Sequence, residues 1–191
     1  MLEIRWHGRG GQGAKTAAFL LGEALATTGK YVQAFPEYGP ERTGAPVVAY
    51  DRVSDEPIRV HSPVTTPRYV VVLDLTLAAA VDLAAGVPDD GMILVNTGKA
   101  PDEVRRTLKL DGRPIRVLTV DAHRISLQTL KRSIPNTPML GALVKAAELL
   151  PREQFMQAMR DNLSHKFHGR PHLVEANMAA IEQAYEEVAA R

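Results

Sequence analysis

The sequence contains no cysteine among its 191 residues. This absence excludes disulfides, thiolate nucleophiles, and zinc or iron–sulfur clusters held by cysteines of this chain. Neither sign of charge is in excess, since 23 Lys and Arg face 22 Asp and Glu, so no global field favours nucleic acid or an anionic membrane. Apolar runs are also short, and no window approaches the ~20 apolar residues of a membrane span. The start of the chain has no signal-peptide layout, so we expect a cytoplasmic protein.

What remains is ordinary for a globular chain. Apolar residues make up 45% and charged residues 24%, and the length favours one domain over two. We expect a single domain over residues 1–191. The six histidines predict no metal site, because His165, His168 and His172 lack a nearby acidic residue.

Strand-like and helix-like segments alternate along most of the chain. Strands are expected at Leu2–Gly8, Tyr31–Phe35, Val47–Arg52, Ile58–His61, Tyr69–Leu73, Met92–Val95 and Ile115–Val120. Helices are expected at Ala14–Thr28, Leu75–Ala85, Pro101–Leu108, His123–Ser133, Thr137–Leu150, Arg152–Asn162 and Leu173–Ala190. This order predicts an α/β fold of the Rossmann-like kind, with a mostly parallel sheet flanked by helices.

Two departures from strict alternation are predicted. Val47–Arg52 and Ile58–His61, joined by a turn at residues 53–57, read as a small antiparallel excursion. From Asn136 onward the pattern is wholly helical, which indicates a helical C-terminal tail packed on the sheet. The Leu2–Gly8 strand is expected near the middle of the sheet.

A glycine-rich turn follows the first strand. It satisfies G-x-G-x-x-G and stands between a strand and a helix, where unpaired helix amides attract a phosphate or carboxylate. The candidate anion-binding or cofactor-binding residues are Gly8, Arg9, Gly10, Gly11, Gln12, Gly13 and Lys15. The alternative is a turn that merely closes the strand onto its helix. A dinucleotide site also needs an acidic residue at the end of the second strand, which here ends in Gln33-Ala34-Phe35, so nicotinamide binding is doubtful.

A second motif spans Phe35 to Pro46. Two glycines and three prolines fix the path of this loop, and its polar groups can face a partner protein. The candidate interface residues are Phe35, Glu37, Tyr38, Glu41, Arg42, Thr43 and Pro46. The alternative is a solvent loop with a local Glu–Arg pair.

Both motifs leave the carboxyl ends of predicted strands, where α/β sheets bind ligands. Residues 96–99 and 121–123 are expected at the same edge, as loop and helix-capping residues. No nucleophile–base pair, carboxylate dyad or metal set is recognisable. The chain on its own therefore does not look like a catalyst.

The two motifs together, Arg5-Trp6-His7-Gly8-Arg9-Gly10-Gly11-Gln12-Gly13-Ala14 and Phe35-Pro36-Glu37-Tyr38-Gly39-Pro40-Glu41-Arg42-Thr43-Gly44-Ala45-Pro46-Val47, resemble the gamma subunits of pyruvate:ferredoxin oxidoreductases. The pyruvate enzymes are also called pyruvate synthases, and they belong to the 2-oxoacid:ferredoxin oxidoreductase family. The form of the second motif favours pyruvate as the 2-oxoacid.

The resemblance implies a hetero-oligomer in which alpha-, beta- and delta-type subunits hold thiamine diphosphate, magnesium and the iron–sulfur clusters. This chain would pack beside the thiamine-bearing subunits and help to seat coenzyme A, with no cofactor bound tightly by itself. The isolated chain could also form a homodimer, and the sequence leaves this question open. The alternative function is a free-standing nucleotide-dependent oxidoreductase that uses the glycine-rich turn.

Overall fold

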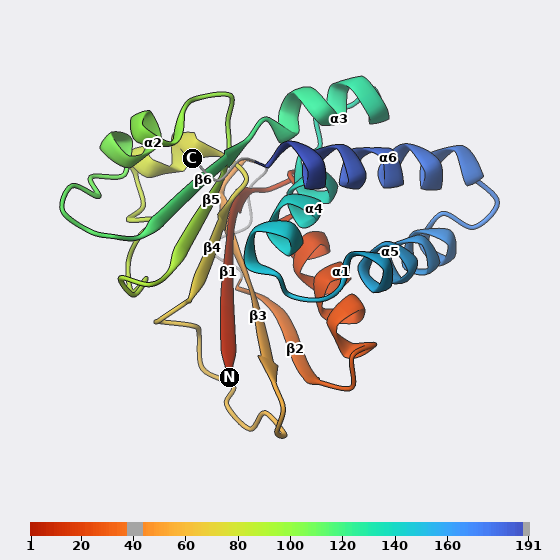
Figure 1. Ribbon diagram of the computed structural model, residues 1–191, viewed down its shortest axis with the longest axis horizontal. Coiled ribbons are helices and arrows are strands. Elements are labelled where there is room, and N and C mark those ends of the chain that lie inside the picture. Colours follow the sequence, from red (N-terminus) through yellow and green to blue (C-terminus); the bar gives the residue numbers. More distant parts are fainter. Residues whose placement is uncertain (38–43, 189–191) are drawn as a thin grey trace.

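The computed structural model describes residues 1–37 and 44–188. A sheet has the strand order β2-β3-β1-β4-β5-β6 (Figure 1). The strands are β1 (Leu2–Arg9), β2 (Tyr31–Glu37), β3 (Pro46–Ser54), β4 (Tyr69–Val72), β5 (Met92–Asn96) and β6 (Arg116–Val120). The helices are α1 (Ala14–Ala26), the 3-10 helix η1 (Leu75–Ala79), α2 (Pro101–Thr107), α3 (Ala122–Leu130), α4 (Asn136–Ala147), α5 (Arg152–Lys166) and α6 (Pro171–Glu187).

The sheet is mostly parallel, as predicted. β1, β4, β5 and β6 pair in parallel, whereas β3 pairs antiparallel with β1 on one side and with β2 on the other. Because β3 runs against both neighbours, β2 points the same way as β1. The first strand is third of six in the order and therefore lies near the middle.

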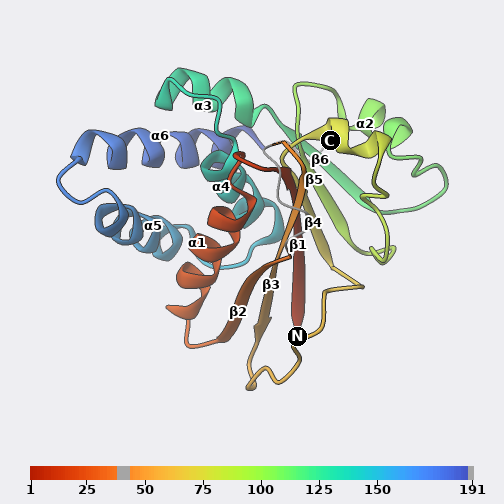
Figure 2. The ribbon, with the colours of Figure 1, turned by 180° about the vertical axis from the view of Figure 1, so that it is seen from behind.

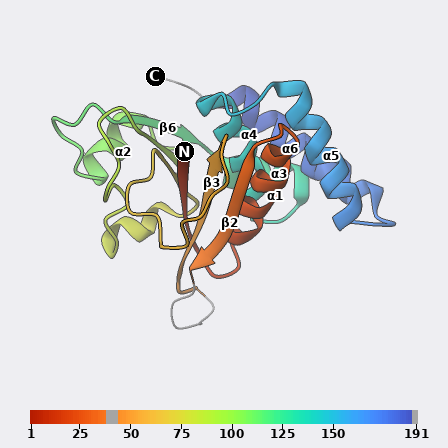
Figure 3. The ribbon, with the colours of Figure 1, turned by 90° about the horizontal axis from the view of Figure 1, so that it is seen from below.

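Helices cover both faces of the sheet unequally (Figures 2 and 3). One face carries α1 and the C-terminal helices α3 to α6, over a hydrophobic cluster that includes Trp6, Val71 and Leu94. The other face carries η1 and α2, over a smaller cluster that includes Val70 and Ile93. Alternate residues of β4 thus enter opposite clusters, which explains its unbroken β-branched sequence.

The predicted strand at Ile58–His61 is wrong. These residues belong to no strand, because β3 is already paired along both sides. The carbonyls of Val60 and Ser62 instead accept hydrogen bonds from the Arg52 guanidinium, at 3.3 and 2.6 Å. The antiparallel element is therefore β3 itself, inserted between β2 and β1.

The predicted helix at Leu75–Ala85 is also wrong beyond its first turn. Only Leu75–Ala79 is helical, as a 3-10 helix that Asp74 caps by accepting from the Thr76 amide at 2.9 Å. The carbonyls of Leu83 and Ala85 accept from Arg5 instead, at 3.3 and 2.7 Å. A side chain thus replaces the helical partners of this segment.

The other helices begin and end within a few residues of the predicted bounds. β2 continues to Glu37, two residues past its expected end, because Pro36 is tolerated in a strand at the edge of a sheet. Within residues 1–37 and 44–188, no helix is long and apolar enough to cross a membrane.

Candidate functional site

The glycine-rich turn joins β1 to α1 at the carboxyl end of β1. Gly11 and Gly13 have positive φ angles of 95° and 85°, which L-residues rarely adopt, whereas Gly8 and Gly10 do not. Gly8 is needed for close approach, since a Cβ there would lie 3.2 Å from Leu73 Cδ1. Gly13 is the N-cap of α1 and provides no side-chain cap for its first amides. The first amides of α1 are therefore left without a side-chain acceptor at the turn.

Arg9 does not extend from the turn toward solvent. Its Nε pairs with Asp74 Oδ2 at 3.0 Å, one terminal nitrogen donates to the Gly44 carbonyl at 3.1 Å, and the other donates to Thr76 Oγ1 at 2.9 Å. Gln12 completes the network, because its Oε1 accepts from the Arg9 amide at 2.8 Å and its Nε2 donates to Asp74 at 3.0 Å. Arg9 thus ties the ends of β1 and β4 to the start of β3.

The electrostatics of Asp74 agree with this network. Partial burial alone would raise the pKa of Asp74, but hydrogen bonds from Thr76, Gln12 and Arg9 together outweigh it and lower the pKa below its usual value. Asp74 is therefore a carboxylate at neutral pH, and it offsets the charge of Arg9. Lys15, the other predicted cation, lies with its ammonium 5.6 Å from the centre of the Phe19 ring.

The structure describes only the two ends of the second motif. Phe35 is half-buried on β2, and Glu37 and Pro46 are exposed at the end of β2 and the start of β3. Tyr38, Glu41, Arg42 and Thr43 lie outside the described residues. The Gly10 amide donates to the Ala45 carbonyl at 3.0 Å, so the glycine turn is bonded directly to this motif.

Aromatic and charged side chains gather on the sheet face opposite α1, beside the second motif. The Phe35 and Tyr50 rings lie 5.2 Å apart, and the Tyr50 hydroxyl donates to Glu37. The Arg52 guanidinium lies 5.3 Å from the centre of the Phe35 ring and pairs with Glu3 at 2.8 Å. We call Phe35, Glu37, Tyr50 and Arg52 the aromatic face. It gives the start of the motif a fixed support.

The loops after β4, β5 and β6 line a cavity of about 530 Å³ with Gln12. Asp121 caps α3 by accepting from the Arg124 amide at 2.9 Å, which confirms its predicted capping role. The Asn96 side chain donates to the Leu73 carbonyl at 2.9 Å and accepts from the His123 amide at 3.1 Å. These polar groups are thus occupied in holding the loops together.

A second cavity, of about 400 Å³, lies on the other side of the glycine turn, between α1, α4, α5 and α6. Gly11, Gly13 and Asn136 line it together with three cations, Arg132, Lys166 and Arg170. We call it the basic cavity. The sequence analysis did not single out these cations. For Lys166 and Arg170 the signal was the basic stretch at 165–172, but only the packing of four helices brings it to the turn.

The geometry does not favour a dinucleotide site. In the dinucleotide-binding fold the second strand lies beside the first and supplies the acid for the ribose. Here β3 separates β2 from β1, and Glu37 at the end of β2 is hydrogen-bonded by Tyr50. The fold and site therefore define an α/β protein with a glycine-rich turn at the start of α1 and no recognisable nicotinamide site among the described residues.

Comparison with known proteins identifies the family. The profile of the family "Pyruvate ferredoxin/flavodoxin oxidoreductase" matches residues 3–187. The "Pyruvate synthase subunit PorC" of Thermotoga maritima is 48% identical over 186 residues, covering 97% of this chain and 94% of that protein. The "Pyruvate/ketoisovalerate oxidoreductases common subunit gamma" of Pyrococcus furiosus is 46% identical, covering 98% and 97%. The chain belongs to the pyruvate ferredoxin/flavodoxin oxidoreductase family, as its two motifs predicted.

Solved structures agree. The crystal structure of the pyruvate oxidoreductase subunit PORC of Thermotoga maritima matches with a TM-score of 0.84 at 45% identity, covering 98% of this chain and 97% of that one. A 2-oxoglutarate:ferredoxin oxidoreductase chain from Magnetococcus marinus matches with a TM-score of 0.75 at 17% identity. It shows the same fold within a longer chain, of which 32% is covered. These matches do not favour a free-standing nucleotide-dependent oxidoreductase.

Proposed function

We propose that this chain is the gamma-type subunit of a multi-subunit pyruvate (2-oxoacid):ferredoxin oxidoreductase and is not catalytic alone. The similarity to PorC and gamma subunits over nearly the whole of both chains carries this proposal. The lack of cysteine supports it, because cysteine-ligated iron–sulfur clusters then belong to other chains. The whole chain would form one gamma-type domain in the cytoplasm, with pyruvate as the substrate of the assembled enzyme.

Partner subunits of the alpha, beta and delta type would hold thiamine diphosphate, magnesium and the clusters. We place their docking at the segment from Phe35 to Pro46, including Tyr38, Glu41, Arg42 and Thr43. The aromatic face supports this placement at the start of the segment, and the hydrogen bond from the Gly10 amide to the Ala45 carbonyl supports it at the end, while Glu37 and Pro46 stay exposed. Strand ends that are already ordered lose little entropy on docking.

Coenzyme A is the ligand we propose for the glycine-rich turn, Gly8 to Gly13, with Lys15 beside it. The uncapped amides at the start of α1 and the positive φ angles of Gly11 and Gly13 support this, because they allow a phosphate to approach the backbone. Arg9 would reach such a ligand only by leaving Asp74.

Reconstitution tests the proposed function. The purified chain alone should oxidise no 2-oxoacid and carry no chromophore, and pyruvate oxidation with coenzyme A should appear when the partner subunits are added. The partner subunits without this chain are the matched control. Turnover by the chain alone, or full turnover by the partners without it, would refute the proposal.

A further inference from the structure

The basic cavity has an excess of positive charge within the described chain. Arg132, Lys166 and Arg170 line it, and no Asp or Glu is among the described residues that do. Each of the three lacks an ion-pair partner within residues 1–37 and 44–188. Other arginines on the same side of the sheet are paired, such as Arg152 with Glu182 at 2.7 Å and Arg160 with Glu175 at 2.5 Å. Unpaired cations around one hollow indicate a site for an anion.

Two helix N-termini lie beside the same hollow. The first residues of α1 and of α4 line it, and within the described chain neither helix has a side-chain cap at its N-terminus. Figures 1 and 2 show these helices side by side on one face of the sheet, with α5 and α6 completing the wall. Two helix N-termini add partial positive charge to that of the three side chains.

Asn136 gives an independent indication. This residue is only 7% exposed, and it lies against Gly13, where a Cβ would come within 2.6 Å of Asn136 Nδ2. Its Oδ1 accepts from Thr137 Oγ1 at 3.3 Å, but its Nδ2 donates to no group among the described residues. Because Asn136 lines the basic cavity, this amide donor is available to an anion bound there.

Lys166 is an exposed residue whose side chain is partly covered by its neighbours in the cavity wall. Burial lowers the pKa of Lys166 below its usual value, and the Glu23 carboxylate only partly opposes this. An anion bound in the cavity would relieve that cost. Leu20 and Phe167 are among the apolar residues that wall the cavity, so an anion there would be only partly screened by solvent.

We propose that the basic cavity binds the phosphate groups of a phosphate-bearing ligand, through Arg132, Lys166, Arg170 and the Asn136 amide. A groove between α1 and α5, lined by the half-exposed Phe19, shares Thr16, Leu20 and Lys166 with the cavity and offers room for an apolar part of the same ligand. The inference deepens the coenzyme A proposal above and rests on it only for the identity of the ligand.

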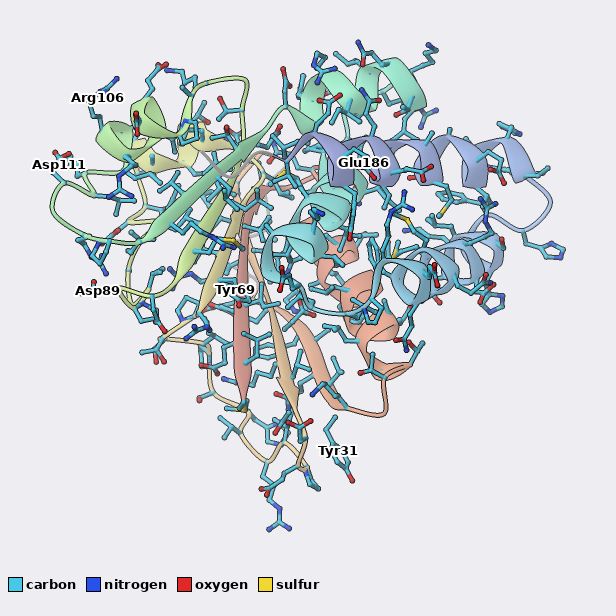
Figure 4. All side chains as sticks on the ribbon, in the orientation of Figure 1. Tyr31, Tyr69, Asp89, Arg106, Asp111 and Glu186 are labelled. Carbon is cyan, nitrogen blue, oxygen red and sulfur yellow. The ribbon has the colours of Figure 1, made fainter. Side chains whose placement is uncertain are left out.

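Titration calorimetry of the full chain with inorganic pyrophosphate tests the cavity directly. Arg132→Gln, Lys166→Gln and Arg170→Gln should each weaken binding about ten- to a hundredfold, as expected for the loss of one charge-assisted contact. Arg106→Gln is the matched control, since it removes one exposed cation from α2 on the opposite side of the sheet (Figure 4). Asn136→Asp places a carboxylate in the cavity at constant size and should abolish binding. Thermal unfolding confirms that each variant is folded.

The assembled enzyme separates this inference from the proposed function. If the cavity variants lose pyrophosphate and also raise the KM for coenzyme A, both stand. If they lose pyrophosphate while the KM is unchanged, the cavity is a phosphate site and the coenzyme A proposal fails. An equal loss in Arg106→Gln would overturn the inference, because attraction would then follow overall charge. Absence of pyrophosphate binding at millimolar concentration, together with an unchanged KM for coenzyme A, would also overturn it.

Discussion

The indole Nε1 of Trp6 donates a 2.7 Å hydrogen bond to Asp51 Oδ2 and so joins the middle of β1 to β3 within the core. Asp51 is fully buried, and its other oxygen, Oδ1, has no partner among the described residues. Burial raises the pKa of Asp51 well above its usual value, and the Trp6 bond opposes this only in part. The core therefore favours the protonated acid.

Asp51→Asn should stabilise the protein increasingly as the pH rises from 4 to 7. A raised pKa in the folded state means that wild-type stability is present below the unfolded pKa, near 3.9, and is lost above it, by up to about 1.4 kcal/mol per pH unit. Asparagine keeps an acceptor for Trp6 and does not titrate. Urea unfolding at pH 4 and pH 7 measures the difference, which must grow with pH for this explanation to hold.

His7 should give the opposite pH dependence. Burial, and secondarily the charge of Arg5, lower the pKa of His7 to about 3, so the folded protein holds a neutral imidazole. Wild-type stability is therefore present above the unfolded pKa, near 6.5, and is lost as the pH falls toward 3, by up to about 1.4 kcal/mol per pH unit. His7→Gln should remove this loss between pH 7 and pH 4. His172→Gln, at an exposed position, is the control; equal pH profiles for the two variants would contradict the assignment.

Arg9→Ala should act through the network around Asp74. Its loss leaves the Asp74 carboxylate without its cation and the Gly44 carbonyl without that donor, at a cost of about 1 kcal/mol after screening at this partly exposed position. Asp74→Asn should lower the Tm similarly, and the two effects should be less than additive. The KM for coenzyme A should shift alike in both. A rise in KM for Arg9→Ala alone would mean that Arg9 contacts coenzyme A directly.

Gly13→Ala should destabilise the protein more than Gly11→Ala. Both residues have positive φ, which costs an L-residue about 1 to 2 kcal/mol. Only at Gly13 would the new Cβ collide with a neighbour, Asn136, and such overpacking adds about 1 kcal/mol or more. Chemical denaturation of both variants gives the comparison. Equal losses would show that Asn136 moves aside freely.

Exchanging the charges of the second motif should weaken assembly without unfolding the chain. The double variant Glu41→Lys/Arg42→Glu reverses two side chains that we propose to face a partner. Lys30→Glu/Asp55→Lys is the matched control, because it swaps an exposed pair at the opposite ends of β2 and β3. Analytical ultracentrifugation with the partner subunits measures assembly. Normal assembly of the Glu41/Arg42 variant would remove this segment from the interface.

The sequence was sufficient for the fold class because its strongest signals are local. The β-branched run at Tyr69–Val72 and the glycines before α1 each specify one element without reference to the rest of the chain. Ile58–His61 shows the limit of such signals. Its apolar spacing suits a strand, but both sides of β3 were already taken by β1 and β2.

The site was less accessible to prediction, for two physical reasons. Alternation in β1 ordinarily indicates one solvated face, yet Arg5 and His7 are buried, and Arg5 donates to carbonyls of the segment after η1. Arg9 was assigned to a ligand from its place beside the turn, whereas its partner Asp74 is 65 residues away in sequence. Contacts between residues so far apart in sequence form only in the completed sheet, and no periodic pattern in the sequence predicts them.

The position of β2 at one edge of the sheet affects how the subunit behaves before assembly. An exposed strand border can recruit a strand from another molecule and so begin aggregation. Pro36 removes one amide from that border, and the strand also ends in the charged Glu37. Both features should keep a separately made subunit from aggregating before it assembles, and Pro36→Val should increase its aggregation.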